Sequence, residues 1–356
     1  MRTPVPLFLL ITILCGCCAA QRATETTPEP FPDVASDRSP PVPEGGVQAV
    51  LGRAYLPTLQ AVLSGARETV RVIHFELNDD ELGDAVVEAL AEVAARGVDV
   101  RVLLEADVHA NAARVTELQG VGITAKLDTD LRYTHAKLVV ADGSTALLGS
   151  TNWSWMSVNK NNEADVLITD PALAGFFGAV ADALWDAPAK RADPETVITA
   201  HGVALATGDY VDHAMALINN ARSRVDLVVY GMNPSDQYPD SDVFRLIDAL
   251  VAAQARGAAV RVVLEWADYG AGVNEVNTHA VEVLQSRGIP VRFDPPEVIT
   301  HAKVLVADDS VIVGSNNWGF GGFSLYHEVG LRSTDAALVA AMAAFCDEVW
   351  AAGFQP

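Results

Sequence analysis

The second half of the chain repeats the first, element by element. The segment ARGVDVRVLLE at residues 95–105 matches ARGAAVRVVLE at residues 255–265, and THAK occurs at 134–137 and again at 300–303. The spacing between equivalent positions grows from 160 residues at Ala95 and Ala255 to 166 residues at His135 and His301. Loops therefore differ in length while the order of elements is kept. Each copy, at roughly 150 residues, is as long as an ordinary domain, so we expect two similar lobes.

Each half alternates apolar strands with amphipathic helices. Strands are expected at Val70–Phe75 and Val225–Tyr230, followed in each half by a helix. A second strand in each half, Val98–Leu104 or Val260–Leu264, is rich in valine and leucine, which is typical of a strand buried on both faces. This alternation predicts an α/β fold of two α/β/α sandwich lobes, related by a pseudo-twofold axis.

The repeat and the composition also predict domain boundaries. We expect an N-terminal lobe at residues 47–190, a linker at 191–206 marked by Pro194 and Gly202, and a C-terminal lobe at 207–356. Residues 21–46 are rich in proline, serine, threonine and acids, which predicts an extended tether.

The first 20 residues indicate an export signal. Arg2 is followed by the short apolar run Leu7–Leu14 and then by small residues up to Ala20. The run is too short to remain as a membrane-spanning helix. The segment Leu14–Cys17 resembles a bacterial lipobox, so we expect export to the cell envelope and a membrane tether through lipidated Cys17. The alternative is cleavage after Ala20, which would release a soluble periplasmic or secreted protein.

Only Cys346 lies outside the N-terminal segment. It has no partner for an internal disulfide, so we expect it to pack as a small apolar residue.

One pattern of polar residues occurs at the same place in both halves. It consists of His-x-Lys, an Asp after four intervening residues, then Gly-Ser-x-Asn and, eleven residues past the Asn, a Glu. The first copy is His135, Lys137, Asp142, Gly149, Ser150, Asn152 and Glu163. The second copy is His301, Lys303, Asp308, Gly314, Ser315, Asn317 and Glu328.

These residue types fit the binding of a phosphoryl group. Residues i and i+2 of a strand point to the same face, so the histidine and lysine of each copy enter one pocket. The lysine offers a positive charge and three hydrogen-bond donors to phosphate oxygens. Serine and asparagine add donors, and the glycine allows the backbone to approach closely. Two such sets around one phosphate would stabilise phosphoryl transfer without a metal, in a single active site at the lobe interface.

Both copies resemble the signature of the phospholipase D superfamily, HxKxxxxD followed by GSxN, and the resemblance covers about residues 47–354. The second copy departs slightly, with one residue fewer between Asp308 and Gly314. The resemblance implies no cofactor or metal, a nucleophilic His135 that forms a phosphohistidine, and His301 as general acid and base. It also implies that each imidazole is oriented by a glutamate of the motif. We expect that glutamate to belong to the same copy as the histidine.

The motif aspartates and several residues outside the motif have simpler expected roles. Asp142 and Asp308 are expected to be structural, at turns between strands. His74 is expected in the core or the pocket wall. Five aromatic residues near the motifs are expected either to line the mouth of the pocket and contact the substrate or to pack within a lobe, namely Trp153, Trp155, Trp318, Phe320 and Tyr230. The histidines outside the motif show no metal-ligand spacing.

The substrate is constrained mainly by charge. The net charge is −22, and two of the five lysines belong to the motif, which argues against an extended nucleic-acid-binding surface. We therefore expect hydrolysis of a phospholipid, with a metal-independent endonuclease as the alternative. A cardiolipin synthase-like phosphatidyltransferase is disfavoured because no pair of N-terminal membrane helices is evident. A non-catalytic binding module is disfavoured because both motif copies are complete. Since one chain carries both copies, a monomer suffices for activity.

Overall fold

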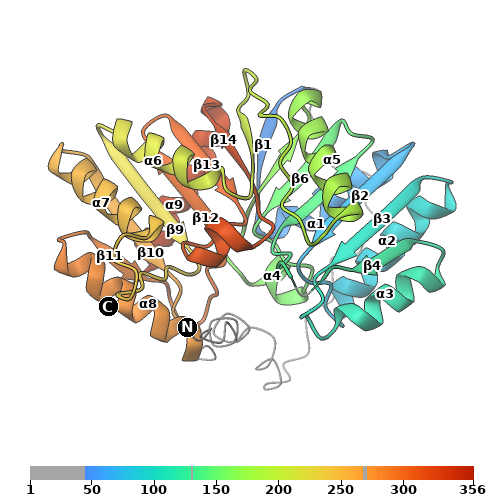
Figure 1. Cartoon of the computed structure of the whole chain (residues 1–356), viewed down its shortest axis with the longest axis horizontal. Helices are drawn as coiled ribbons and strands as arrows, with labels where there is room; N and C mark the ends of the chain where they lie inside the picture. Colours follow the sequence, from blue (N-terminus) through green and yellow to red (C-terminus); the bar gives the residue numbers. More distant parts are fainter. Residues whose placement is uncertain (1–44, 130, 268–270) are drawn as a thin grey trace, which may run out of the picture.

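Two mixed β-sheets of seven strands stand side by side, each flanked by helices (Figure 1). The computed structural model describes residues 45–356 except 130 and 268–270. The expected export signal, Cys17 and nearly all of the tether lie outside the described residues. Within the described part of the chain, no helix is both long and apolar enough to cross a membrane.

The first lobe has the strand order β1-β7-β6-β5-β2-β3-β4. β2, β3 and β4 are parallel, and the other pairings are antiparallel. Its strands are β1 (Val47–Leu51), β2 (Thr69–His74), β3 (Asp99–Leu104), β4 (Thr124–Leu127), β5 (Lys137–Ala141), β6 (Thr145–Gly149) and β7 (Ala164–Ile168). Its helices are α1 (Tyr55–Gly65), α2 (Glu81–Ala95), α3 (Asn111–Gly120), α4 (Trp155–Asn159) and α5 (Pro171–Asp186), with a short 3₁₀ turn η3 (Gly52–Ala54).

The second lobe repeats this topology in the order β11-β10-β9-β12-β13-β14-β8. Its strands are β8 (Val203–Ala206), β9 (Arg224–Val229), β10 (Ala259–Leu264), β11 (Val291–Phe293), β12 (Lys303–Ala307), β13 (Ser310–Gly314) and β14 (Val329–Ser333). Its helices are α6 (Tyr210–Asn220), α7 (Asp242–Ala255), α8 (Ala271–Ser286) and α9 (Ala336–Ala352), with a short π-helix η4 (Gly321–Leu325). β8 falls within the predicted linker and pairs with β14, so the second lobe begins before residue 207.

Each sheet is covered on both faces, as an α/β/α sandwich requires. In the first lobe, α5 packs on β2, β5 and β6, while α1 and α2 belong to the apolar cluster on the other face. In the second lobe, α9 packs on β9, β10 and β12, while α6 and α7 belong to the opposite cluster. The predicted fold class is confirmed, and the double coverage explains why β5 and β12 are buried at every position.

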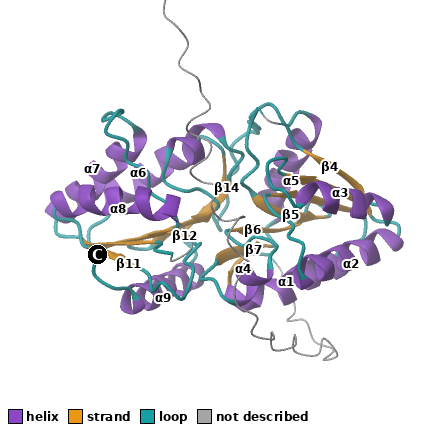
Figure 2. Cartoon of the chain, turned by 90° about the horizontal axis from the view of Figure 1, so that it is seen from below, coloured by secondary structure: helices purple, strands orange, loops and turns teal. Residues whose placement is uncertain are grey.

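The lobes meet through equivalent elements near the middle of the molecule. β6 and β7 contact β13 and β14, α5 contacts β8, and α9 contacts β1. Helices α2 and α3 lie at one end of the molecule and α7 and α8 at the other (Figure 2). One apolar cluster contains buried residues of both lobes, among them Phe177, Val313 and Met342. Cys346 is buried in this cluster, which confirms its apolar role.

The motif aspartates hold the start of the neighbouring strand. Asp142 accepts three hydrogen bonds of 2.8–2.9 Å from the backbone N–H groups of residues 67–69, and Asp308 accepts the same three from residues 222–224. Both adopt positive φ, 53° and 49°. The turn after β5 has one residue more than the turn after β12, because Ala141 pairs with Thr145 but Ala307 pairs with Ser310. The structural role expected for both aspartates, and the harmless difference in spacing, agree with this geometry.

Candidate active site

The two motif histidines are each held by the backbone of the opposite lobe. His135 and His301 lie two residues before β5 and β12. The N–H of His135 donates to the carbonyl of His327 at 3.1 Å, and the N–H of His301 donates to the carbonyl of Asn162 at 3.0 Å. Isolated bridges Thr134–His327 and Asn162–Thr300 continue this pairing. The segments that lead into β5 and β12 are thus each paired with the backbone of the opposite lobe.

The orienting glutamates are exchanged between the lobes. Nδ1 of His135 lies 3.0 Å from Oε1 of Glu328, and Nδ1 of His301 lies 3.1 Å from Oε2 of Glu163. The expectation that each glutamate serves the histidine of its own copy is therefore wrong. Glu163 and Glu328 directly follow Asn162 and His327, so the backbone pairing across the interface carries each carboxylate to the other lobe's imidazole.

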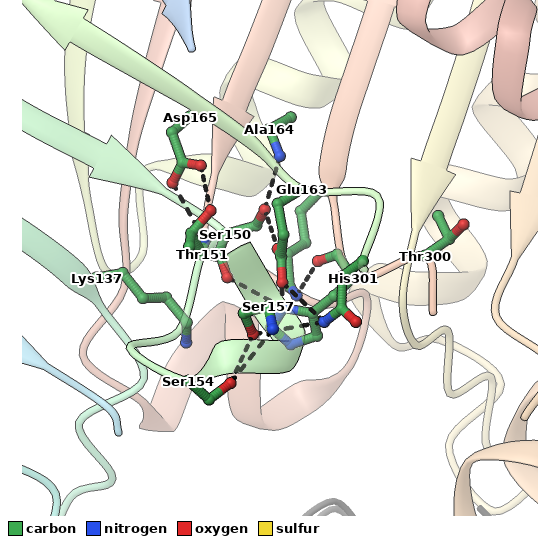
Figure 3. Close-up of polar contacts among 12 residues, drawn as sticks. Lys137, Ser150, Thr151, Ser154, Ser157, Glu163, Ala164, Asp165, Thr300 and His301 are labelled. Atoms are coloured by element: carbon green, nitrogen blue, oxygen red, sulfur yellow. Dashed lines mark hydrogen bonds and ion pairs between the residues drawn. The ribbon is translucent and has the colours of Figure 1, made fainter. Parts of the chain in front are cut away.

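The motif serines hold carboxylates and backbone rather than lining the phosphate pocket as expected. Ser150 donates to Glu163 at 2.6 Å and accepts the N–H of Ala164 at 2.9 Å; Glu163 thus lies between Ser150 and His301 (Figure 3). Ser315 accepts the N–H of Val329 at 3.0 Å and donates to the carbonyl of Val329 at 3.3 Å. A fully buried carboxylate such as Glu163 requires a donor, and this requirement occupies the hydroxyl of Ser150.

Two buried lysines supply the positive charge of the site. Lys137 and Lys303 are 1% and 3% exposed, and each Nζ donates to the carbonyl of the histidine two residues earlier. Lys137 also lies over the ring of Phe75 at 4.8 Å, and Lys303 over the ring of Tyr230 at 5.3 Å. Burial lowers the pKa of Lys137 to about 8, against the opposing effect of nearby carboxylates led by Glu328.

Asn152 and Asn317 complete the polar set. Both are 8% exposed, and their side-chain oxygens are buried without a hydrogen-bond partner among the described residues. Buried polar atoms are normally satisfied, so these two oxygens are available to accept a hydrogen bond from a ligand.

Burial and the lysines keep both imidazoles neutral. Burial lowers the pKa of His301 to about 4, with Lys303 acting in the same direction and Glu163 in the opposite one. Burial also holds the pKa of His135 well below its ordinary value, with further lowering by Lys137, Lys303 and His301. Groups of both motif copies therefore act on the ring of His135.

The two histidine–glutamate pairs differ electrostatically. Burial acts to raise the pKa of Glu163, but His301 and Lys303 hold it below its ordinary value. Burial raises the pKa of Glu328 to about 8. The first lobe has a further buried acid, Asp165, two residues after Glu163, which accepts hydrogen bonds from Thr151. The equivalent position in the second lobe, two residues after Glu328, is Gly330, which has no acidic side chain. The pseudo-twofold site is therefore chemically asymmetric.

Sequence reasoning missed two pairs of buried carboxyl groups behind the histidines. Glu105 accepts the backbone N–H of Thr134 and hydrogen-bonds Asp128, and Glu265 with Asp294 repeats the arrangement beneath Thr300. In both halves the aspartate comes seven residues before the motif histidine, so the repeat itself carried the signal.

Two buried asparagines also escaped notice. Asn111 binds the backbone of Phe75, Leu77 and Glu105, tying the ends of β2 and β3 together. Asn277 does the same at the ends of β9 and β10.

The aromatic residues divide between core and site. Trp153 and Trp318 are 0% and 1% exposed and donate to Tyr55 and Tyr210 within their own lobes, so the packing interpretation holds for them. Trp155 is half-buried against the first-lobe core, and Phe320 is 60% exposed. Tyr230 contacts His301 edge to face, with ring centroids 4.9 Å apart. His74 is buried and stacks on Trp153 at 4.2 Å, which is the core role expected for it.

No group of three or more His, Cys, Asp or Glu side chains in the described chain is arranged to hold a metal ion.

Comparisons with known proteins identify the family. The model of the family "Cardiolipin synthase, PLD-like domain" matches residues 59–185 and 214–350, one match in each lobe. The chain belongs to the phospholipase D superfamily, whose members act on phosphodiesters.

Its relatives include hydrolases and synthases. A mitochondrial cardiolipin hydrolase of Chlamydomonas reinhardtii is 30% identical over 35% of this chain, and the match spans about half (54%) of that relative. A cardiolipin synthase A of Pseudomonas putida is 27% identical, covering 80% of this chain and 64% of that protein. The solved phosphatidylserine synthase of Haemophilus influenzae shares the fold with a TM-score of 0.67 at 13% identity, covering 86% of each chain.

Proposed function

We propose that this protein hydrolyses a phospholipid phosphodiester through a phosphohistidine intermediate. The observation that carries the proposal is the pair of buried imidazoles, each with Nδ1 bound to a carboxylate of the other lobe and with buried lysines from both motif copies beside them. Binding of Nδ1 leaves Nε2 of each ring as the reactive nitrogen.

The asymmetry of the two glutamates supports distinct roles. Glu163 keeps its negative charge and stabilises a protonated His301, which suits a general acid. His135 has the neutral imidazole that a nucleophile needs. In the first step Nε2 of His135 bonds to phosphorus, and the leaving alcohol departs with a proton from His301. In the second step His301 removes a proton from water, the water oxygen bonds to phosphorus, and the bond to His135 breaks.

The charge of the substrate favours uptake from solvent of the proton that His301 gives to the leaving alcohol in the first step. Both imidazoles have lowered pKa values, so His301 is mostly neutral at pH 7. A monoanionic phosphodiester between the lysines raises the pKa of His301 by adding negative charge beside it. The lysine ammonium groups are placed to stabilise the charge that develops on the phosphoryl oxygens, and the side-chain N–H groups of Asn152 and Asn317 are the donors that the motif can add.

A lipid is favoured over nucleic acid as the substrate. The net charge of −22 disfavours polyanionic nucleic acid, and cardiolipin hydrolases are among the relatives. A phosphatidyltransferase would use a lipid alcohol where a hydrolase uses water, and the same test separates the two.

The test is turnover of cardiolipin, phosphatidylglycerol and single-stranded DNA, with and without EDTA and added glycerol. We expect lipid to be cleaved to phosphatidic acid with EDTA present, and a phosphatidyl-glycerol product in place of phosphatidic acid would indicate a transferase. His135→Ala is expected to be inactive on every substrate. His301→Ala should retain the first step on bis(p-nitrophenyl) phosphate, whose leaving group needs no proton. Faster turnover of DNA than of any lipid would contradict the proposal.

A further inference from the structure

The described surface carries a small apolar rim beside the active site, formed by Leu131, Phe320 and Leu325. These side chains are 78%, 60% and 44% exposed. They account for three of the seven large hydrophobic side chains that stand exposed on the described chain. Such side chains are normally scattered, so their meeting at one place requires an explanation.

The rim is built from one loop of each lobe. Arg132, next to Leu131, donates to the carbonyls of Ser324 and Leu325 at 3.3 and 3.0 Å. Phe320 and Leu325 lie five residues apart, at the cap and the end of η4, where the N–H of Tyr326 donates to the carbonyl of Gly321. One turn of a π-helix spans about that distance, so the two side chains leave the turn on the same side.

Local packing forces the rim outward. A Cβ on Gly321 would lie 2.4 Å from the ring of Tyr326, and a Cβ on Gly322 would lie 2.4 Å from the carbonyl of Asn317. Glycine at both positions lets η4 lie flat against the motif loop. The neighbouring Phe323 fills the lobe core, stacking on Tyr210 at 5.6 Å, which leaves Phe320 and Leu325 to the surface.

Aromatic rings connect the rim to the catalytic centre. Tyr133 and Tyr326 face each other with centroids 5.0 Å apart, and Tyr326 lies 6.2 Å from the ring of His135. Phe75 contacts both Tyr133 and His135, at 5.5 and 5.3 Å. A molecule held at the rim would therefore adjoin the site where a phosphodiester is attacked.

The charge of the rim fits a phospholipid surface. Acidic residues give the chain a net charge of −22, yet residues 310–327 contain no charged side chain. In the first lobe, Leu131 is flanked in the sequence by one acid and one base, Asp130 and Arg132, and Arg132 binds the carbonyls of this segment. An anionic bilayer would therefore repel this part of the protein less than the rest of its acidic surface.

We propose that the rim of Leu131, Phe320 and Leu325 inserts into the acyl region of a phospholipid bilayer and places headgroup phosphodiesters at the active site. The proposal rests on the proposed lipid hydrolysis and adds that the enzyme works at a membrane surface. The half-buried Tyr133 and Tyr326 lie behind the rim at the headgroup level, where aromatic rings with a polar hydroxyl are favoured.

The test is sedimentation with vesicles of phosphatidylcholine and phosphatidylglycerol. The chain starts at residue 21, the form that cleavage after Ala20 would release, so that no lipid anchor contributes. A His135→Ala background prevents turnover, which separates failure of docking from failure of the proposed hydrolysis. The rim pair Leu131→Ser and Leu325→Ser is compared with the control pair Val121→Ser and Ile198→Ser, which are 47% and 72% exposed elsewhere.

We expect the rim pair to weaken vesicle binding at least about tenfold, because each Leu→Ser change removes an inserted aliphatic side chain. The control pair should bind within about twofold of the parent. With the active histidine restored, the rim pair should lose turnover of vesicle lipid relative to bis(p-nitrophenyl) phosphate. A parent that does not bind vesicles, or a rim pair that binds as the parent does, overturns the proposal. So does an equal loss of single-stranded DNA binding in the rim pair, since it would mean that the rim stacks on bases.

Discussion

At the residue scale, the exchange of glutamates makes each imidazole depend on a carboxylate from the other lobe, and the two carboxylates are not equivalent. Glu163 remains ionised beside His301, whereas burial raises the pKa of Glu328 to about 8. Glu163→Gln should lower the proton affinity of His301 and therefore weaken general-acid catalysis. We expect kcat/KM to fall about 10²–10³-fold on a lipid and much less on bis(p-nitrophenyl) phosphate.

Glu328→Gln serves as the control for that change. It alters the partner of the nucleophile, so it should reduce turnover of both substrates to a similar degree. If both variants lost the same fraction of lipid turnover relative to bis(p-nitrophenyl) phosphate turnover, the assignment of His301 as the acid would be contradicted. Steady-state kinetics at pH 5 to 8 with the two substrates provides the measurement.

Glu105 and Asp128 form a buried pair of carboxyl groups beside Thr134. Burial raises the pKa of Glu105 to about 9, with the charge of Asp128 acting in the same direction. Oδ2 of Asp128 has no donor among the described residues, which is the position that a shared proton would satisfy. Between the ordinary carboxyl pKa near 4.5 and about 9, the folded state holds more protons than the unfolded state, so stability falls as pH rises through this range.

Glu105→Gln should remove this pH dependence, because an amide donates to Asp128 without a titrating proton. We expect its free energy of unfolding, relative to the parent, to increase by at least about 1 kcal/mol between pH 5 and pH 9. Urea denaturation at pH 5, 7 and 9 measures the difference. A constant difference across these pH values would show that the carboxyl pair is fully ionised.

At the element scale, Asp142 joins the end of β5 to the start of β2. Although burial acts to raise it, hydrogen bonds from three backbone N–H groups hold the pKa of Asp142 below its ordinary value. Its stabilising effect is therefore present at neutral pH and is lost as pH falls through that lowered pKa. Asp142→Ala removes three acceptor contacts and leaves an alanine at a φ of 53°. We expect a loss of about 2–4 kcal/mol in the free energy of unfolding.

The same variant should retain its kcat below the unfolding transition, because Asp142 only joins strands and touches no group of the site. Asp142→Asn keeps the turn conformation and most of the hydrogen bonds, so it should lie between the parent and the alanine variant. Denaturant unfolding and turnover measured on one preparation test this. A large loss of kcat in folded Asp142→Asn would give the aspartate a catalytic role.

The elements that carry the motif could be read from sequence, because repetition and apolar periodicity act locally. β2 and β3 formed within a residue of their expected bounds, as did their counterparts β9 and β10. The short outer strands β1 and β8 gave no such signal, since a strand of four or five residues is fixed by its partner. The exchange of Glu163 and Glu328 could not be foreseen either, because it depends on how two lobes dock rather than on any spacing along the chain. The serine hydroxyls were misassigned for a different reason, because their contacts lie within one lobe and follow from the pairing of the strand before each serine with the strand after it.

At the scale of the whole molecule, the active site exists only while the lobes remain joined. His135 and His301 take both a backbone hydrogen bond and a carboxylate from the opposite lobe. One apolar cluster runs through both lobes beneath this site. The two lobes resemble separate domains in sequence but share their core, which predicts that they unfold together.

Phe177→Ala tests this cooperativity. The ring is fully buried in the cluster that spans both lobes, so its removal should cost about 3–5 kcal/mol and lower the midpoint for the whole molecule. Calorimetry should show a single transition before and after the change, with loss of activity at the same temperature. Leu90→Ala is the matched control, because Leu90 lies in a cluster confined to the first lobe. If each variant instead showed a separate early transition for one lobe, the lobes would be independent folding units. The shared core would then not be what keeps the exchanged histidine–glutamate pairs together.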